Sequence, residues 1–319
     1  MNTEISFYYL DCCPFIWKPA HLLDDFSDMK RMGGDSVCIS ILEEDHSGNY
    51  KGKVALAHEA GLKVYAVPSR VGGLFAGSPK VPSMFCARNM DTLMMTRNGT
   101  PQDATAGLTC CANNPKFQGW FLQWIERLVS ESGVEGVVFD EPKEAHKPCY
   151  CDICVGLCEA RSDEALTRLR EEAVAALIGQ ACAAIKQTGE SHKTILFVMP
   201  DATENFINRL LAERDVDYFG NDGPMCHQGP RAQKHQKTRL TQSVPAIFEK
   251  AGKAGKKTFT LIETFHVLEV ALPELRAELK KTKAWRADMY AFYYYGPSNE
   301  NAAEVMRITE GAIRELRNE

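Results

Sequence analysis

The chain lacks the long apolar run that a membrane-spanning helix requires, because no apolar stretch in its 319 residues reaches about 18 positions. Its first residues, MNTEISFYYLDCCPF, have no basic start, apolar core or small-residue cleavage site, so we expect no signal peptide and a cytoplasmic protein. The formal net charge of −5 provides no basic field for nucleic acid or an anionic membrane. We therefore expect neither as a partner, and a sugar or another small molecule as the ligand.

The sequence alternates short β-rich runs with longer amphipathic segments, in a composition that is 45% hydrophobic and 25% charged. Eight β-rich runs occur, at 4–11, 36–45, 63–69, 133–142, 193–202, 216–224, 257–267 and 287–296. Eight strand–helix units in this length predict the α/β class and a (β/α)8 TIM barrel, with residues 1–319 as a single domain. A doubly wound sheet is the alternative, but LDCCPF after the first strand is no Gly-rich phosphate loop.

One connection, residues 70–115, is far longer than a barrel loop needs to be. It is rich in Gly, Pro, Ser, Thr and Asn, and it follows the third predicted strand. Loops of this length in compact domains are usually functional. We expect it on the catalytic face, where it walls or covers a pocket.

Polar and aromatic side chains gather at the predicted carboxyl ends of the strands, which is the rim that holds the active site in TIM barrels. They are Asp11, Glu43, Glu44, Asp45, Ser69, Arg70, Asp140, Glu141, Asp201, Asn221, Asp222, Glu263, His266 and Tyr293 to Tyr295. Acids and aromatics without a phosphate loop favour a carbohydrate substrate, since glycosidic cleavage uses two carboxyl groups. Glu141 and Glu263 supply such a pair; helix capping or a polar turn is the structural alternative.

Two motifs carry a resemblance to glycosidases. FDEP at 139–142 and LIETF at 261–265 resemble the clan of retaining barrel glycosidases, which implies Glu141 as acid/base and Glu263 as nucleophile. Asp140 stands where that clan has an Asn that contacts the sugar 2-hydroxyl. GVEGVVFD at 133–140 also resembles strand four of α-amylase-type and fucosidase-type barrels, which implies Asp140 as nucleophile with Asp222 or Glu263 as acid/base. Adjacent residues of a regular strand point to opposite faces of the sheet, so we expect only one of Asp140 and Glu141 to face the site. The sequence leaves the choice between them open.

A closer resemblance covers most of the chain. Four segments together are similar to uncharacterised glycoside-hydrolase-like barrel proteins of bacteria: 68–83, CANNP at 111–115, FDEPK at 139–143 and CYCDIC at 149–154. This resemblance implies a fold and a site but no substrate.

A cysteine cluster follows the fourth strand. Cys149, Cys151, Cys154 and Cys158 have the spacing of thiolates that converge on tetrahedral zinc, and four such ligands make a structural site. His146, Cys110 or Cys111 is an alternative to Cys158, and free thiols are the structural alternative. The expected site resembles the cysteine-bound zinc of some barrel β-galactosidases. No organic cofactor is expected.

Further residues are expected to contact the substrate. Arg70 suits an anionic sugar substituent or a salt bridge, and aromatic rings suit stacking on a sugar. The full set of expected contacts is Asp11, Trp17, Glu43, Arg70, Asp222, His266 and Tyr294. Two other functions stay open: a metal-dependent hydrolase or lyase, against which the lack of an H-x-H pair at a strand end counts, and a saccharide-binding barrel without activity.

Overall fold

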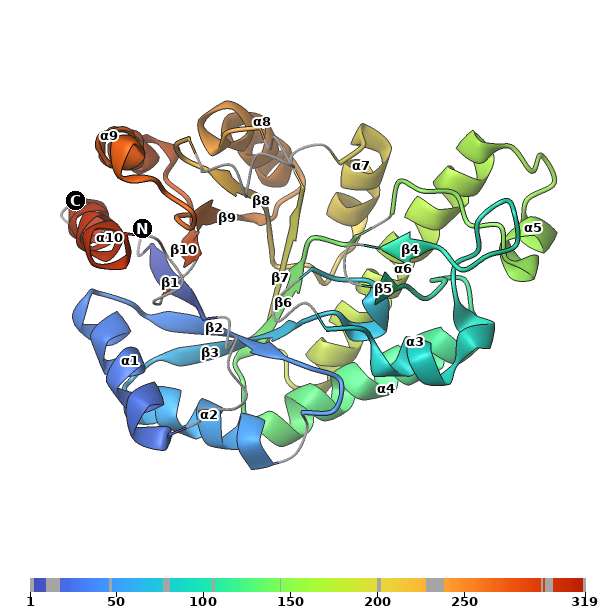
Figure 1. The fold of residues 1–319 in the computed structure, drawn as a ribbon, viewed down its shortest axis with the longest axis horizontal. Helices are drawn as coiled ribbons and strands as arrows, with labels where there is room; N and C mark the ends of the chain where they lie inside the picture. Colours follow the sequence, from blue (N-terminus) through green and yellow to red (C-terminus); the bar gives the residue numbers. More distant parts are fainter. Residues whose placement is uncertain are drawn as a thin grey trace.

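The structure is a computed structural model, and it describes residues 3–9, 18–45, 48–76, 81–104, 107–143, 145–199, 202–227, 238–293, 295 and 301–317. Eight parallel strands close into a barrel in the order β1-β10-β9-β8-β7-β6-β3-β2 (Figure 1). They are β1 (Glu4–Tyr9), β2 (Ser36–Ile41), β3 (Lys63–Pro68), β6 (Gly136–Asp140), β7 (Lys193–Val198), β8 (Tyr218–Pro224), β9 (Lys257–Glu263) and β10 (Met289–Tyr293). The (β/α)8 barrel predicted from the sequence is confirmed.

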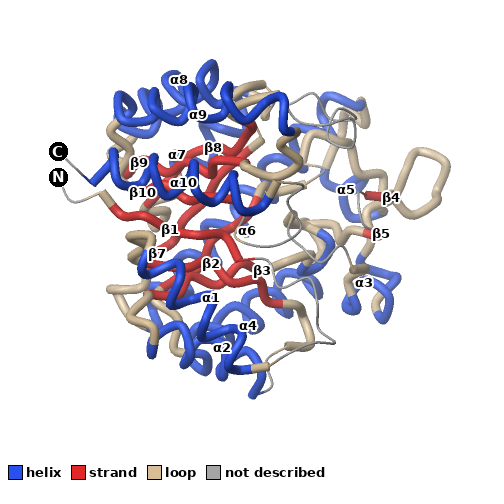
Figure 2. Tube along the Cα trace, turned by 60° about the vertical axis from the view of Figure 1, so that its left-hand side comes forward, coloured by secondary structure: helices blue, strands red, loops and turns tan. Residues whose placement is uncertain are grey.

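Helices surround this barrel on its outer side (Figure 2). They are α1 (Pro19–Arg31), α2 (Gly48–Glu59), α4 (Pro115–Ser132), α6 (Asp163–Thr188), α7 (Glu204–Ala212), α8 (Leu240–Lys253), α9 (Leu272–Lys281) and α10 (Ala302–Arg317). Among the described helices, none has the length and apolar character needed to cross a bilayer.

The sequence explains where these helices begin and end, as α4 shows. Asn114 caps its first turn by accepting a hydrogen bond from the Lys116 amide at 3.0 Å, and Pro115 takes the first helical position. Gly133 ends the helix in the left-handed conformation, with φ of 79°. The apolar face between these caps is buried against the barrel, which stabilises a helix that propensity alone would not.

The long connection between β3 and α4 has structure of its own. It contains η1 (Val71–Gly73), α3 (Met84–Arg88), η2 (Met90–Thr92) and a two-stranded ribbon of β4 (Asp103–Ala104) and β5 (Gly107–Leu108). Of these elements, α3, β4 and β5 lie together with α5 (Asp152–Leu157) at one side of the barrel in both views (Figures 1 and 2). The remaining short helices are η3 (Glu269–Ala271) and η4 (Thr282–Trp285).

Alternate strand residues face the barrel interior, because side chains on a strand point to opposite faces in turn. The interior cluster consists of Tyr8, Cys38, Tyr65, Val67, Val138, Ile195, Phe197, Tyr218, Phe259, Leu261, Met289 and Ala291, with Tyr293 packed against it. The residues between them, such as Phe7, Val137 and Ile262, belong to the larger core under the helices. Both faces of the sheet are therefore buried, as expected for a parallel barrel.

Candidate active site at the barrel mouth

Three barrel strands, β6, β8 and β9, each carry an inward-facing carboxylate near their C-terminal end, on the edge of the barrel that we call the carboxylate rim. Asp140 lies two residues beyond the interior residue Val138 on β6, and Glu263 two residues beyond Leu261 on β9. Asp222 occupies the corresponding position on β8, four residues beyond Tyr218. All three side chains are buried, with at most 6% exposed. The strand register therefore directs three acids toward the same end of the barrel.

Tyr8 connects β1 to this group of acids. Its hydroxyl donates to Asp140 Oδ2 at 2.8 Å inside the barrel. Burial, and then the neighbouring charge of Asp140, raise the pKa of Tyr8 well above its ordinary value. The phenol therefore keeps its proton and stabilises Asp140 in the ionised form.

Aromatic rings continue from Tyr8 toward Glu263. Tyr8 pairs with Tyr293 across β1 and β10, and their rings meet edge to face at 5.8 Å. Tyr293 in turn pairs with Glu263 across β10 and β9, and its ring packs against Phe265 at 5.0 Å. The wall between Asp140 and Glu263 on this side is thus aromatic, which suits the apolar face of a sugar ring.

Glu141 has a different environment from Asp140. It follows the last residue of β6 with φ of 36°, and its carboxylate forms an ion pair with Lys143. The ammonium group also lies 3.4 Å from Met199 Sδ, while the Lys143 amide donates to Leu74 O at 2.7 Å. Glu141 is 4% exposed. The nearby positive charge favours the ionised form of this carboxylate.

Arg70 is held in a tight turn beside Asp140. It has φ of 60°, is buried, and donates from Nη1 to Phe75 O at 3.3 Å. The Ala76 amide donates to Asp140 O at 2.9 Å, which joins the turn to β6. Gly73, at φ of 66°, must be glycine because a Cβ would lie 2.2 Å from Leu108 O.

The carboxylate of Glu43 accepts hydrogen bonds from this turn and from the long loop that follows it. Its Oε1 accepts from the Gly72 amide at 2.7 Å and from Ser83 Oγ at 2.5 Å, and its Oε2 accepts from the Phe85 amide at 2.7 Å. Both carboxylate oxygens are thus engaged with the long loop. The structure gives Glu43 a supporting position, where the sequence suggested contact with substrate.

His266 takes positive φ, at 53°, and packs on Phe265 with ring centroids 4.8 Å apart. Arg70, Glu141 and His266 are three non-glycine residues with positive φ that follow barrel strands closely, after β3, β6 and β9. Such backbone strain occurs preferentially at functional sites.

Several predicted residues lie outside the described ranges: Asp11, Trp17, Asp201 and Tyr294. Tyr295 packs against Phe7 on the helix side of the sheet, at 6.1 Å, so it faces away from the barrel interior. Tyr8 and Lys143 are site residues that were not predicted from the sequence. The alternation in EISFYYLD marks Tyr8 as inward once Phe7 is assigned to the helix side; for Lys143 the sequence carries no such signal.

Four cysteines form a second candidate site, beside the barrel. The sulfurs of Cys111, Cys149, Cys151 and Cys154 all lie within 4.8 Å of one another, with Cys111 3.4 Å from Cys154 and 3.6 Å from Cys151. Tetrahedral zinc with bonds of about 2.3 Å separates its sulfurs by about 3.8 Å, so this set fits a metal ion. Within the described ranges, no other group of three or more His, Cys, Asp or Glu side chains meets this criterion.

The fourth sulfur is that of Cys111, from the long loop, which was an alternative in the sequence, and not that of Cys158. Cys158 follows the end of α5 with φ of −115° and ψ of 97°. The helix that would have placed it one turn beyond Cys154 has already ended, so its buried thiol lies outside the group.

Electrostatics in this group favour a cation. Hydrogen bonding among the thiols lowers the pKa of Cys149 and raises that of Cys111. Four thiolates this close repel one another unless a positive ion compensates their charge. The group therefore has the donor chemistry of a closed structural zinc site.

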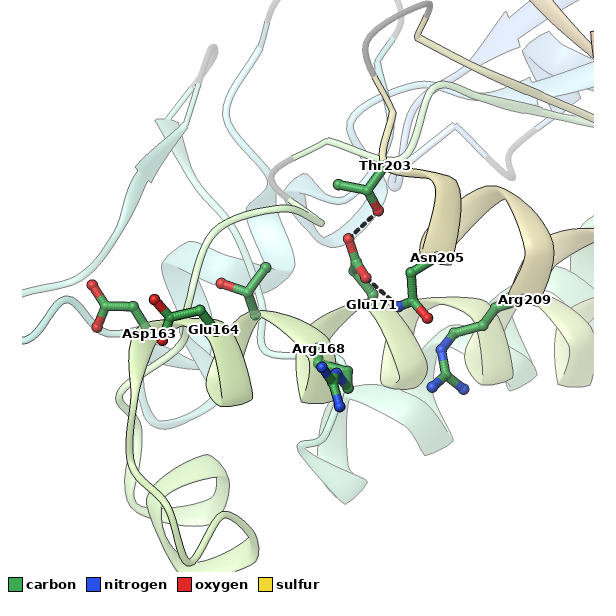
Figure 3. A pocket seen from close by; sticks show the side chains of 8 residues that line it. Asp163, Glu164, Arg168, Glu171, Thr203, Asn205 and Arg209 are labelled. Carbon is green, nitrogen blue, oxygen red and sulfur yellow. Dashed lines mark hydrogen bonds between the residues drawn. The ribbon is translucent and has the colours of Figure 1, made fainter. Parts of the chain in front are cut away.

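A hollow of about 540 Å³ lies on the outer side of the barrel, between α6 and the start of α7 (Figure 3). Glu171 forms one wall, accepting hydrogen bonds from the Thr203 hydroxyl and from Asn205 Nδ2 at 2.5 Å. Glu171 and Thr203 also line a smaller hollow that extends to Pro142 and Met199. Asp140, Asp222 and Glu263 do not line the larger hollow.

Comparison with solved structures shows that this fold is shared with glycosidases. No family model matches the chain, and no curated protein sequence matches it. The structure is similar to β-galactosidase from Marinomonas ef1, with a TM-score of 0.72 and 11% identity over 99% of this chain and 60% of that one. It is also similar to α-L-fucosidase isoenzyme 2 from Paenibacillus thiaminolyticus, with a TM-score of 0.65 and 13% identity.

A third similar structure matches the chain almost end to end. The endo-1,4-β-mannanase from Rhizomucor miehei has a TM-score of 0.63 and 12% identity, covering 99% of this chain and 95% of the mannanase. By contrast, the chain spans 49% of the fucosidase, whose match covers 99% of this chain. The chain therefore has the barrel fold that these glycosidases share.

Proposed function

We propose that this protein is a glycoside hydrolase, or a transglycosidase of the same chemistry, that acts on a carbohydrate at the barrel mouth. The observation that carries the proposal is the convergence of buried inward carboxylates on one rim, with Tyr8 fixing Asp140 at 2.8 Å. Glycosidases stabilise an oxocarbenium-like transition state with two carboxyl groups, and the aromatic wall beside them suits a sugar ring. The shared fold with glycosidases supports the same function.

Asp140 and Glu263 form the pair that the geometry favours. Asp140 faces the interior and is held as an anion by Tyr8, which suits attack on the anomeric carbon. Glu263 donates a proton to the leaving oxygen as the glycosidic bond breaks, and then takes a proton from the water that hydrolyses the bond between the sugar and Asp140. The sequence first suggested Glu141 as acid/base, but Lys143 beside Glu141 opposes the protonated form that a general acid needs.

The remaining rim residues are proposed substrate contacts. Asp222 shares the inward direction of the two catalytic carboxylates, while Arg70 and His266 lie on the adjoining turns. The names of the similar structures suggest hexose or deoxyhexose glycosides as the class to screen. Zinc on the four cysteines would join the long loop to the segment that follows the catalytic strand β6, and would leave no open position for water.

Carboxamide variants test the catalytic pair. On a panel of 4-nitrophenyl α- and β-glycosides, including α-L-fucoside and β-D-galactoside, we expect Asp140→Asn and Glu263→Gln each to lower kcat by at least ~10³-fold. Added azide should restore turnover by the variant that lacks the nucleophile and yield a glycosyl azide of inverted configuration, because azide then displaces the leaving group directly. The variant that lacks the acid/base should give a glycosyl azide of retained configuration, because azide then attacks the glycosyl-enzyme. The exposed acid Glu44, substituted by Gln, is the matched control.

The same panel separates the alternatives. If Glu263→Gln yields the inverted glycosyl azide while Glu141→Gln shows the large loss, the roles return to Glu141 as acid/base and Glu263 as nucleophile. If the wild-type protein binds oligosaccharides but cleaves none of the glycosides, the binding-only barrel replaces the enzyme.

A further inference from the structure

Two other cysteines meet in the long loop, outside the four-cysteine group. The Sγ atoms of Cys86, on α3, and Cys110, before α4, are 3.3 Å apart, and both side chains are at most 1% exposed. Thr92 Oγ1 lies 3.3 Å from Cys110 Sγ. Although Cys110 and Cys111 are adjacent in the chain, one side chain meets Cys86 and the other joins the metal-binding group.

Both cysteines belong to the network that supports the rim of the barrel. The Cys110 amide donates to Gly72 O at 2.9 Å, and the Cys86 amide donates to Ser83 Oγ at 3.0 Å. Ser83 and Gly72 both donate to Glu43 Oε1. A bond between the two sulfurs would therefore act on the loop that carries Arg70.

We propose that Cys86 and Cys110 are a reversible disulfide site, oxidised by a low-molecular-weight disulfide and independent of the metal group. The sulfurs need to approach by about 1.2 Å to reach bonding distance. Cys86 is the attacking thiol because it lies on the short helix α3, whose local opening exposes it. In the closed loop, a hydrogen bond from Cys110 also lowers the pKa of Cys86. This inference does not depend on the proposed function.

The exchange proceeds in two steps. The Cys86 thiolate attacks one sulfur of oxidised glutathione, forming a mixed disulfide and releasing one glutathione. Cys110 then attacks the Cys86 sulfur, so that the protein disulfide forms and the second glutathione leaves. The two thiol protons end on the two glutathione molecules. Because both sulfurs are buried, α3 must open locally, and the reaction is slow.

The disulfide would join positions 24 residues apart and restrict the loop in the unfolded chain. Oxidation is therefore expected to raise Tm by several degrees. The bonded pair also fixes α3 to the segment that supplies Cys111, so the metal content should not fall.

The test equilibrates the purified protein in buffers of reduced and oxidised glutathione, with metal content measured before and after. After acid quenching, alkylation and trypsin digestion, peptide 81–88 should be linked to peptide 98–116, with the alkyl label on Cys111. The same buffers are applied during refolding from the reduced, denatured state, where burial protects neither thiol.

Variants identify the bond. Cys86→Ser should abolish the link and the shift in Tm while keeping the metal, and Cys182→Ser, at another buried cysteine, should change neither. The proposal is overturned if both Cys86 and Cys110 remain alkylated after equilibration and after refolding. It is also overturned if the bond forms through Cys111 instead.

Discussion

At the scale of single residues, the environment of each carboxylate decides what it can do at the barrel mouth. Asp140 and Glu141 are neighbours in the chain, yet Asp140 accepts from a neutral phenol inside the barrel and Glu141 pairs with Lys143. The difference arises because β6 ends at Asp140 and the backbone turns to positive φ at Glu141. Adjacent acids therefore take separate roles.

Tyr8→Phe tests the contact that holds Asp140. Losing the hydroxyl should lower the free energy of unfolding by about 1–3 kcal/mol, as for a buried hydrogen bond to a charged group. Tyr65→Phe is the matched control, because Tyr65 donates to Glu4 at 3.0 Å from inside the same barrel. Urea unfolding should show similar losses for the two variants, whereas only Tyr8→Phe should lower kcat, by ~10-fold or more. Equal turnover in both would contradict a role for Tyr8 in the site.

At the scale of strands, an acidic residue before every second barrel strand holds the strand pair in register. In four pairs, this acid accepts from an amide at or next to the start of the preceding strand. The contacts are Asp35 with Ile5 at 2.9 Å, Glu135 with Val64 at 2.6 Å, Asp217 with Thr194 at 2.9 Å, and Asp288 with Thr258 at 2.8 Å. All four lie at the amino ends of the strands, opposite the carboxylate rim, where barrel residues serve stability.

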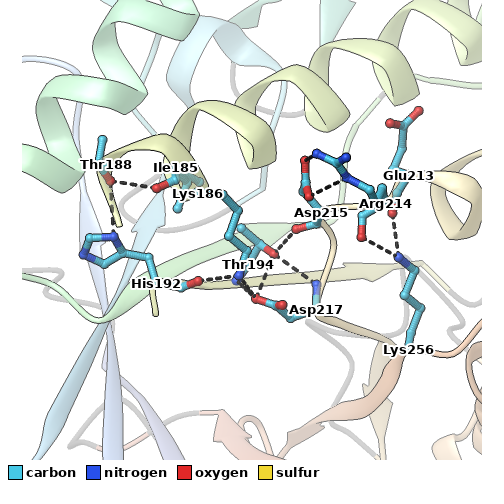
Figure 4. Close-up of polar contacts among 10 residues, drawn as sticks. All are labelled: Ile185, Lys186, Thr188, His192, Thr194, Glu213, Arg214, Asp215, Asp217 and Lys256. Atoms are coloured by element: carbon cyan, nitrogen blue, oxygen red, sulfur yellow. Dashed lines mark hydrogen bonds and ion pairs between the residues drawn. The ribbon is translucent and has the colours of Figure 1, made fainter. Parts of the chain in front are cut away.

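Among the described contacts, the carboxylate of Asp217 accepts more hydrogen bonds than that of the other three acids, and Figure 4 shows its surroundings. Its Oδ2 also accepts from Lys186 Nζ at 2.5 Å. Asp217→Ala therefore leaves the Thr194 amide without its side-chain acceptor, and leaves the largely buried ammonium group of Lys186 without its counter-charge and with the His192 carbonyl as its acceptor. We expect a loss of about 2–4 kcal/mol in unfolding free energy. Asp215→Ala is the control, since the carboxylate of Asp215 pairs with the exposed Arg214 and should cost less than about 1 kcal/mol. Comparable losses in chemical denaturation would contradict the register role.

At the scale of the whole molecule, the four cysteines join two distant segments. Cys111 comes from the β3–α4 connection, and the other three come from the segment between β6 and α6. We expect about one zinc per chain by elemental analysis, which Cys111→Ser abolishes and Cys158→Ser, outside the group, retains. Strong chelators should lower Tm of the wild-type protein. Retention of zinc in Cys111→Ser, with loss in Cys158→Ser, would restore the set expected from sequence.

The parts of this structure that sequence predicted are those fixed by local pattern. Alternation and helix caps gave eight strand–helix units, and strand ends located Asp140 and Glu263. The four-cysteine group could be predicted only in part. The spacing C-x-C-x2-C indicates Cys149, Cys151 and Cys154, but whether Cys111 or Cys158 is the fourth member depends on where α5 ends. Likewise, Tyr8 reaches Asp140 across 132 positions, a contact that barrel closure creates and local pattern does not.

Buried tyrosines also determine how the whole fold responds to alkali. Burial is the main reason that the pKa values of Tyr8, Tyr50 and Tyr65 lie above their ordinary value. Above about pH 10 the unfolded chain loses these phenolic protons while the folded chain keeps them, so the unfolded state binds fewer protons and stability falls as pH rises. Each such tyrosine contributes a slope of up to about 1.4 kcal/mol per pH unit.

Urea midpoints measured between pH 8 and 11 should therefore decline above pH 10, and Tyr65→Phe should show a shallower decline than the wild-type protein. Tyrosinate absorbance of the buried group should rise together with the loss of circular dichroism, because these phenols ionise only when the barrel opens. The contribution of Tyr65 to the absorbance is the difference between the wild-type protein and Tyr65→Phe. If that contribution rose while the circular dichroism still showed a folded barrel, solvent would reach the interior of the folded protein. Water would then lie among the inward-facing side chains of the barrel, and the hydrogen bond from Tyr8 to Asp140 would not be shielded from solvent.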